Sequence, residues 1–132
     1  MRKKIFLAIS LILVLSGLYG LQSYSQEKGG LPEYVNRSPD IRAAYEYALE
    51  KPDLLKQIPC YCGCSRFGHK NVEDCFVKEF KENGKVVFEE HGANCGICYS
   101  TALDSKALFE QGKNPQEVKK FIDEKYDQYE TI

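Results

Sequence analysis

The sequence predicts a mostly helical α+β domain, with three main helices around a cysteine-rich irregular centre and one small β-hairpin. Two observations support this fold class. Three segments repeat apolar residues at helical spacing and carry helix start or stop signals: one follows Ser38, one follows Cys98 and one follows Asn114. Between the first two segments, short apolar runs flank the pair Asn83-Gly84, which is typical of a hairpin turn.

The first predicted helix begins after Ser38. The run Ser38-Pro39-Asp40 supplies an N-cap, a proline at the first helical position and an acidic residue in the first turn. Lys51-Pro52-Asp53 then ends the helix and starts a further short turn, which Pro59 ends. The cysteine-rich loop is therefore expected directly after a helix terminus. The apolar positions of the first helix are Ile41, Ala44, Tyr45, Ala48 and Leu49.

The predicted hairpin joins residues 75–80 to residues 85–88. Asn83 and Gly84 both tolerate the positive φ that a two-residue turn demands. Cys75 is then expected at the outer end of a strand, near the open mouth of the hairpin, where His91 and Cys95 also emerge. A helical turn in place of the first arm is the alternative.

Two further helices complete the predicted domain. The second begins at Cys95-Gly96-Ile97-Cys98 and ends at Gly112. The third opens with Asn114-Pro115-Gln116-Glu117, which combines an N-cap, a first-position proline and the glutamate of a capping box. The apolar residues expected on one side of this helix are Val118, Phe121, Ile122, Tyr126 and Tyr129.

Residues 1–25 have the pattern of a secretory signal peptide or an N-terminal membrane anchor. Arg2, Lys3 and Lys4 precede an apolar run from Ile5 to Leu21. This run lies at the short end of what spans a bilayer, so cleavage after Ser25 and retention as an anchor both stay open. Residues 26–30 read as a flexible tether, and residues 31–132 as a single cysteine-rich domain. Either outcome places this domain outside the cytoplasm, where disulfides persist.

Composition limits the function of the exported part. Removing Arg2, Lys3 and Lys4 from 18 basic residues leaves 15 against 19 acidic residues, a net charge near −4. This balance argues against nucleic acid and anionic lipid headgroups as partners, which leaves membrane association to the N-terminal segment. No Ser/His/Asp set, phosphate loop or paired carboxylates stand out, so we predict no catalytic residues and no enzyme. A small core with no Trp and one Met calls for a disulfide or a metal.

The six cysteines supply either thiolate metal ligands or a disulfide framework. Three of them alternate with other residues as Cys60-x-Cys62-x-Cys64, and Cys75, Cys95 and Cys98 follow. A disulfide within Cys-x-Cys is strained, so oxidation would pair each of the first three cysteines with one of the last three. Metal binding asks less of the backbone, because loop thiolates can converge to about 2.3 Å from Zn²⁺. Gly63 permits the tight turn, and the helix N-terminus is expected to lower the pKa of Cys95 and Cys98.

We therefore predict an exported metal-binding protein, with a metal ion and a membrane-bound envelope protein as its partners. Cu(I) and Zn²⁺ both suit such ligands, and six thiolates could hold more than one copper ion. The predicted role is storage, delivery or sensing of the metal. The expected ligands are Cys60, Cys62, Cys64, Cys95 and Cys98, with Cys75, His69 and His91 as additional donors.

Other interpretations remain open. Three disulfides could staple an envelope interaction domain that holds no metal. Each histidine alone is also typical of an exposed loop residue. Cys95 and Cys98 could form a thiol-disulfide redox pair, although the chain lacks the βαβ pattern that usually surrounds such a pair.

The run Pro59-Cys60-Tyr61-Cys62-Gly63-Cys64 reads PCYCGC, and the chain resembles the bacterial PCYCGC-motif proteins, a largely uncharacterised exported family. The resemblance extends from about Leu31 to Tyr126. It implies a location in the cell envelope and leaves the activity open. Members are typically lipoproteins, and this sequence departs from them in having no lipobox cysteine. The flanking matches are Ala43-Ala44-Tyr45-Glu46, Pro52-Asp53-Leu54-Leu55, Gly68-His69-Lys70, Asp74-Cys75-Phe76, His91-Gly92 and Cys95-x-x-Cys98.

Overall fold

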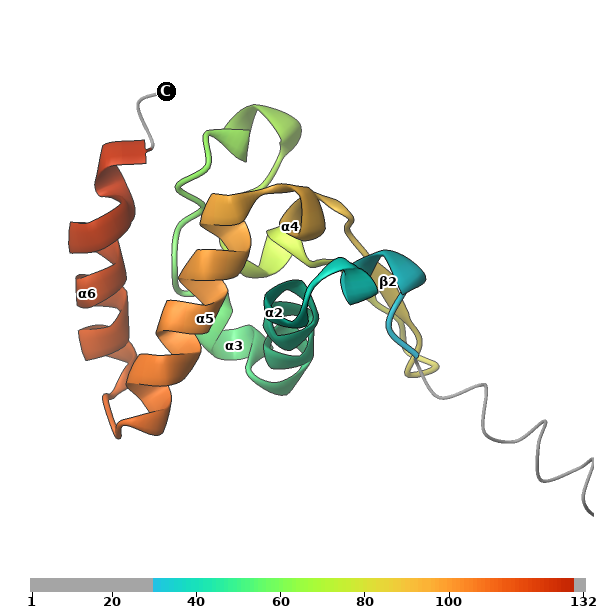
Figure 1. Cartoon of the computed structure of the whole chain (residues 1–132), viewed down its shortest axis with the longest axis horizontal. Coiled ribbons are helices and arrows are strands. Elements are labelled where there is room, and N and C mark those ends of the chain that lie inside the picture. Colours follow the sequence, from blue (N-terminus) through green and yellow to red (C-terminus); the bar gives the residue numbers. More distant parts are fainter. Residues whose placement is uncertain (1–29, 130–132) are drawn as a thin grey trace, which may run out of the picture. The chain divides into compact units, whose positions relative to one another are not determined.

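The computed structural model describes residues 30–129 (Figure 1). The predicted targeting segment and all but the last residue of the predicted tether lie outside the described residues. Within residues 30–129, none of the helices is long and apolar enough to cross a membrane.

Three main helices and a small hairpin form the domain, which confirms the predicted mostly helical α+β class. The main helices are α2 (Pro39–Glu50), α5 (Gly96–Glu110) and α6 (Pro115–Tyr126), and α5 packs against both of the others (Figure 1). Two short helices, α3 (Pro52–Leu55) and α4 (His91–Asn94), lie between α2 and α5 in the sequence. Four 3₁₀ turns complete the helical structure: η1 (Glu33–Arg37), η2 (Cys64–Phe67), η3 (Glu73–Cys75) and η4 (Asp127–Tyr129).

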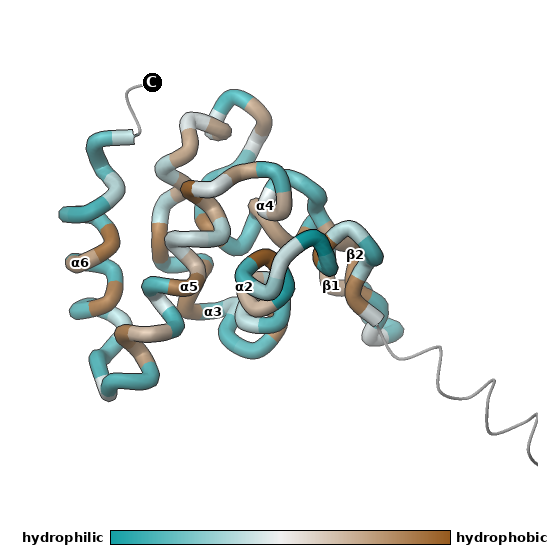
Figure 2. The backbone as a smooth tube through the Cα atoms, viewed as in Figure 1, coloured by the Kyte–Doolittle hydropathy of each residue, from teal (hydrophilic) through white to brown (hydrophobic). Residues whose placement is uncertain are grey.

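The helix starts follow the predicted signals. The Ser38 hydroxyl accepts a hydrogen bond from the Ile41 N–H at 3.1 Å, with Pro39 at the first helical position of α2. At the start of α6, Asn114 and Glu117 form the predicted capping box. The Asn114 N–H donates to the Glu117 carboxylate at 2.9 Å, and the Glu117 N–H donates to the Asn114 Oδ1 at 3.0 Å. Residues of opposite hydropathy alternate along α2 and α6, as in helices that bury one side (Figure 2). Of the residues predicted on one side of this helix, Phe121 is 45% exposed, and Tyr129 lies beyond α6 in η4 and is 37% exposed.

The hairpin pairs β1 (Val77–Phe80) with β2 (Val86–Phe88), antiparallel and with Val77 opposite Phe88. Two details of its prediction are wrong. Cys75 ends the turn η3, and the strand begins only at Val77. The connection is not a two-residue turn, because Lys81 and Lys85 close it through a 2.9 Å hydrogen bond and Gly84 alone takes a positive φ, of 78°. This is the longer hairpin loop in which a single glycine supplies the left-handed residue.

Tyr45 joins α2 to the hairpin and to α4. Its side chain is fully buried and packs edge-on against Phe76, with 5.0 Å between ring centroids. Its hydroxyl donates to the Glu89 carbonyl at 2.5 Å and accepts from the Ala93 N–H at 3.2 Å. One side chain of α2 therefore fixes the backbone on both sides of His91.

Replacing Tyr45 by phenylalanine should destabilise the domain while preserving its packing. The substitution leaves the Ala93 N–H and the Glu89 carbonyl without this partner, which typically costs about 1–3 kcal/mol when the groups are buried. We expect urea denaturation to register that loss. Tyr129→Phe is the control, because Tyr129 is 37% exposed at the domain surface. An equal, small effect of the two substitutions would contradict the bridging role of Tyr45.

Candidate metal centre

The cysteine loop is closed at its base by backbone contacts. The Val72 N–H donates to the Ile58 carbonyl at 2.9 Å, and Pro59 forms a β-bridge with Asn71. Inside the loop, Gly63 takes a φ of 74°, the left-handed conformation that glycine adopts without strain. The predicted turn at Gly63 is thus present, and it holds the three motif cysteines close together.

Four sulfur atoms from three parts of the chain meet beneath this loop. The Cys60 Sγ lies 3.1 Å from the Cys62 Sγ and 3.5 Å from the Cys75 Sγ. The Cys75 Sγ in turn lies 3.3 Å from the Cys98 Sγ. Cys60, Cys75 and Cys98 are 7%, 0% and 3% exposed, so the cluster is part of the hydrophobic core. No disulfide joins any of the six cysteines, and these separations exceed the S–S bond length of about 2.05 Å.

The two histidines extend the cluster toward the surface. The His91 Nε2 lies 3.0 Å from the Cys64 Sγ and 3.5 Å from the Cys62 Sγ. The His69 ring stands edge-on to His91, with 5.2 Å between centroids. Both rings are half-buried, unlike the exposed loop histidines of the alternative interpretation. The His69 Nδ1 is buried and has no hydrogen-bond partner among residues 30–129, as expected of an atom whose partner is a ligand.

These eight donors form three overlapping sets, within each of which the donor atoms lie no more than 4.8 Å apart. Every predicted ligand belongs to at least one of them. We call them the four-cysteine set (Cys60, Cys62, Cys75 and Cys98), the mixed set (Cys62, His91, Cys95 and Cys98) and the two-histidine set (Cys64, His69 and His91). Cys75, predicted only as an additional donor, is fully buried in the four-cysteine set and contacts the sulfurs of Cys60 and Cys98.

Comparison with protein-family models gives one match, which covers residues 18–131. The matched family is described as "Protein of unknown function with PCYCGC motif". The chain belongs to the PCYCGC-motif family. Comparisons with curated proteins and with solved structures gave no match. The geometry of this PCYCGC-motif protein is therefore the guide to its chemistry.

The PCYCGC cluster favours thiolates at two of its cysteines. Hydrogen bonds from the thiols of Cys62, Cys75 and Cys98 lower the pKa of Cys60 far below that of a free thiol. The pKa of Cys95 falls to about 2, because the Cys62 and Cys98 thiols and two N–H groups of the α5 N-terminus hydrogen-bond to its sulfur. Hydrogen bonds to the sulfurs of Cys60, Cys62, Cys75 and Cys95, together with burial, raise the pKa of Cys98. The predicted lowering of the pKa is thus correct for Cys95 and wrong for Cys98.

A short helix that the sequence did not predict positions His91 in this PCYCGC-motif protein. At the start of α4, the Glu89 carboxylate accepts hydrogen bonds from the Glu90 and His91 N–H groups at 2.9 and 3.3 Å, and it pairs with Lys78 at 3.0 Å. Burial would raise the pKa of Glu89, but these contacts lower it overall. In α4, Gly92 packs so closely that a Cβ there would lie 2.5 Å from the Phe76 ring.

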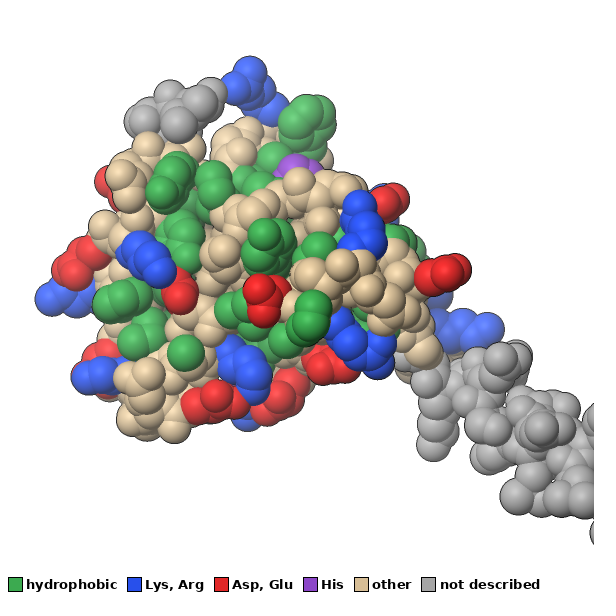
Figure 3. All heavy atoms as spheres, in the orientation of Figure 1, with side chains coloured by type: hydrophobic (Ala, Val, Ile, Leu, Met, Phe, Trp, Pro, Cys, Tyr) green, Lys and Arg blue, Asp and Glu red, His purple; other side chains and the backbone are tan. Residues whose placement is uncertain are grey.

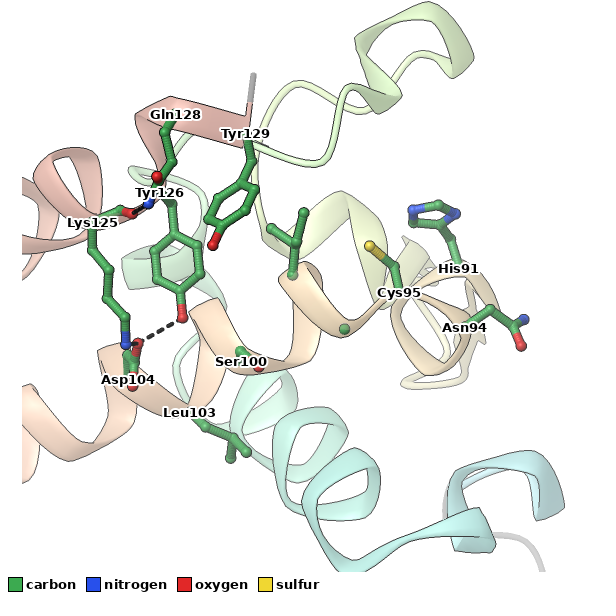
Figure 4. Close-up of a pocket in the computed structure, with 12 residues that line it drawn as sticks. His91, Asn94, Cys95, Ser100, Leu103, Asp104, Lys125, Tyr126, Gln128 and Tyr129 are labelled. Atoms are coloured by element: carbon green, nitrogen blue, oxygen red, sulfur yellow. Dashed lines mark hydrogen bonds and ion pairs between the residues drawn. The ribbon is translucent and has the colours of Figure 1, made fainter. Parts of the chain in front are cut away.

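A cavity of about 880 Å³ reaches the centre from the side of α6. His91 and Cys95 lie at one end of it, and Tyr126, Tyr129 and Lys125 lie at the other (Figure 4). Tyr126 and Lys125 both contact the Asp104 carboxylate, with 2.6 Å from the Tyr126 Oη. The half-buried Cys95 is therefore accessible from solvent, whereas Cys98 one helical turn later is buried.

The arrangement can chelate a thiophilic cation. Four sulfurs at 2.3 Å from a tetrahedral Zn²⁺ would lie about 3.8 Å apart. The Cys60–Cys62, Cys60–Cys75 and Cys75–Cys98 separations of 3.1, 3.5 and 3.3 Å are shorter than this, and all four sulfurs lie within 4.8 Å of one another. A Cys/His cluster in this PCYCGC-motif protein could thus hold a metal ion.

Proposed function

We propose that this protein binds Cu(I) or Zn²⁺ through its PCYCGC loop and the Cys95-x-x-Cys98 pair, outside the cytoplasm. One observation carries the proposal: the sulfurs of Cys60, Cys62, Cys75 and Cys98 converge in the core from three separate parts of the chain. Soft thiolates select Zn²⁺ and Cu(I) over the hard cations that prefer oxygen ligands.

Burial supports a metal ion as the partner of these sulfurs. A thiol is a weak hydrogen-bond donor, and thiolates placed this close together repel one another in a low-dielectric core. A cation removes that repulsion and replaces the thiol protons. Because the ligands come from distant parts of the chain, the binding free energy also stabilises the fold, which suits a domain with a small core.

The proposed location rests on the N-terminal sequence pattern. A secretory signal or anchor would place the domain in the cell envelope, where free cysteines oxidise unless they are ligated. Metal storage, sensing, or delivery to a membrane-bound envelope protein all fit this location.

The test is to purify the exported domain, residues 31–132, without reducing agent or chelator. We expect copper or zinc by elemental analysis, at about one equivalent or more. Native mass spectrometry should detect the bound ion, and denaturing spectra should give the mass of six reduced cysteines. The opposite result would be metal below a tenth of an equivalent, no cysteine that reacts with an alkylating agent, and a mass lower by six hydrogens. That result would contradict the proposal and establish the disulfide-stapled domain.

A thiol-disulfide redox role is the second candidate. The lowered pKa of Cys95, its access to the cavity and the buried Cys98 behind it favour this role. Reduction of insulin by the metal-free, reduced protein would support it, provided that Cys95→Ser abolishes the activity. No insulin reduction by the unmodified protein would remove this candidate.

A further inference from the structure

The three donor sets overlap, and the mixed set links the two-histidine set to the four-cysteine set. His91 belongs to both the two-histidine set and the mixed set, whereas Cys62 and Cys98 belong to both the mixed set and the four-cysteine set. The mixed set thus shares at least one donor with each of the other two sets, whereas the two-histidine set and the four-cysteine set share none. A cation can pass between neighbouring sets while it stays bound to a shared donor.

The two histidines are less buried than most of the sulfurs of the four-cysteine set, although Cys64, which completes the two-histidine set, is 6% exposed. Both imidazoles of the two-histidine set are half-buried, and histidine reaches the molecular surface beside the exposed tip of the cysteine loop (Figure 3). In the four-cysteine set, Cys75 is fully buried and Cys98 is 3% exposed. A hydrated ion or a carrier molecule can therefore reach the histidines before it can reach the buried sulfurs.

We propose that the two-histidine set is an entry site for the metal ion and that His91 passes the ion inward to the four-cysteine set. The proposal rests on the proposed metal-binding function and adds a second, chemically distinct site to it. Its central observation is that one atom, the His91 Nε2, lies 3.0 Å from the Cys64 Sγ and 3.5 Å from the Cys62 Sγ. An ion held by that nitrogen lies within reach of a sulfur on either side.

The transfer is a ligand exchange with no change in oxidation state. The ion first binds Cys64, His69 and His91, and the Cys64 thiol proton passes to water. While the bond to His91 persists, bonds to Cys62 and Cys98 form, and the bonds to Cys64 and His69 break. The incoming thiols release their protons to water, and Cys64 regains one. Finally Cys60 and Cys75 bind, with loss of any remaining thiol protons, and His91 dissociates.

Ligand chemistry gives the transfer its direction. The two-histidine set offers one thiolate and two imidazoles, which suit borderline cations and exchange readily. The four-cysteine set offers four thiolates, which hold Zn²⁺ and Cu(I) more strongly. Each exchange replaces a nitrogen donor by a sulfur donor, so the affinity rises from the surface to the core.

Stopped-flow absorbance with Co²⁺ tests the relay on the full chain, reduced, metal-free and under argon. Thiolate-to-cobalt charge transfer scales with the number of bound sulfurs, so the absorbance per ion should rise about fourfold from entry to final site. We expect two phases in the unmodified protein, a fast weak one and a slower strong one. For His91→Ala we expect loading at least about tenfold slower, with the same final spectrum, because the four-cysteine set is intact.

Two further variants keep the result interpretable. Phe67→Ala is the matched control, since Phe67 is 81% exposed in the same loop and offers no donor; it should load at the unmodified rate. Cys75→Ser removes a ligand of the four-cysteine set alone and should keep the fast phase while the strong phase is lost. Far-UV circular dichroism verifies that each variant folds.

Unchanged loading kinetics in His91→Ala, or a single phase in the unmodified protein, would overturn the relay and leave the proposed metal binding intact. Absence of any thiolate-cobalt band in the unmodified protein would overturn both.

Discussion

Replacing Cys62 by serine is expected to reduce the affinity for Zn²⁺ by more than about 100-fold. Removing a residue that only hydrogen-bonds to a metal ligand typically lowers metal affinity by roughly 10- to 100-fold, and removing a ligand itself should cost more. Cys62 belongs to both the four-cysteine set and the mixed set. Its Sγ lies 3.1 Å from the Cys60 Sγ, inside the buried cluster. Serine preserves the size of the side chain and removes the soft donor. Competition with a chromophoric zinc chelator measures the change.

Cys64→Ser is the matched control for this substitution. It makes the same chemical change two residues later in the same loop, but Cys64 belongs to the two-histidine set alone. We expect its equilibrium affinity to fall by less than about tenfold, since all four thiolates of the buried set remain. Equal losses from the two variants would mean that the four-cysteine set is not the tight site.

Replacing Gly92 by alanine is expected to destabilise the domain by about 2–4 kcal/mol, the range typical of overpacking a core. The added Cβ would lie 2.5 Å from the Phe76 ring and 2.7 Å from the Cys75 carbonyl oxygen. Relief of these clashes requires α4 to move away from Cys75, and His91 begins that helix. Urea denaturation should register the lost stability, and Co²⁺ loading should slow as His91 leaves the sulfurs.

Gly96→Ala separates this packing effect from a general effect of replacing glycine. A Cβ at Gly96 meets only the Tyr99 side chain, at 3.7 Å, an ordinary contact. Alanine in a helix is favoured over glycine by up to about 1 kcal/mol, so this variant should be neutral or slightly more stable. A Gly92→Ala protein as stable as Gly96→Ala would refute the close packing of α4 against Phe76.

Local signals were sufficient to predict the three main helices. Ser38, Asn114 and the prolines that follow them act within one helical turn, so a single sequence contains all the information needed. The hairpin was predicted for the same reason, but its loop type was not. Asn-Gly is compatible with more than one turn, and strand register decides between them. The exposure of Phe121 likewise depends on how α6 is rotated against α5, which no local pattern specifies.

The composition of the site was predictable, but its geometry was not. Cysteine spacing and the two histidines named every member of the three candidate donor sets, because so few residues of this chain can bind a soft metal. The central position of Cys75 depends on where η3 packs, and the positioning of His91 depends on Tyr45, which lies 48 residues before the Ala93 N–H to which it bonds. Such long-range contacts leave no periodic trace in a sequence. No local pattern marked the close packing of Gly92 either, because its need for a missing Cβ arises from the Phe76 ring and the Cys75 carbonyl oxygen, which are distant in the sequence.

Tyr61, the aromatic residue inside the motif, connects the loop mechanically to the C-terminal helix. Its hydroxyl donates to the Asp123 carboxylate, and its ring stacks on that of Tyr126, with 6.5 Å between centroids. If metal binding changes the separation of Cys60 and Cys62, the Tyr61 ring between them would tilt against α6. The chain has nine tyrosines and no tryptophan, so ultraviolet emission can follow that tilt without an added label. Metal binding to the cluster, as proposed, would thus be expected to change the tyrosine emission through a helix that offers none of the candidate donors.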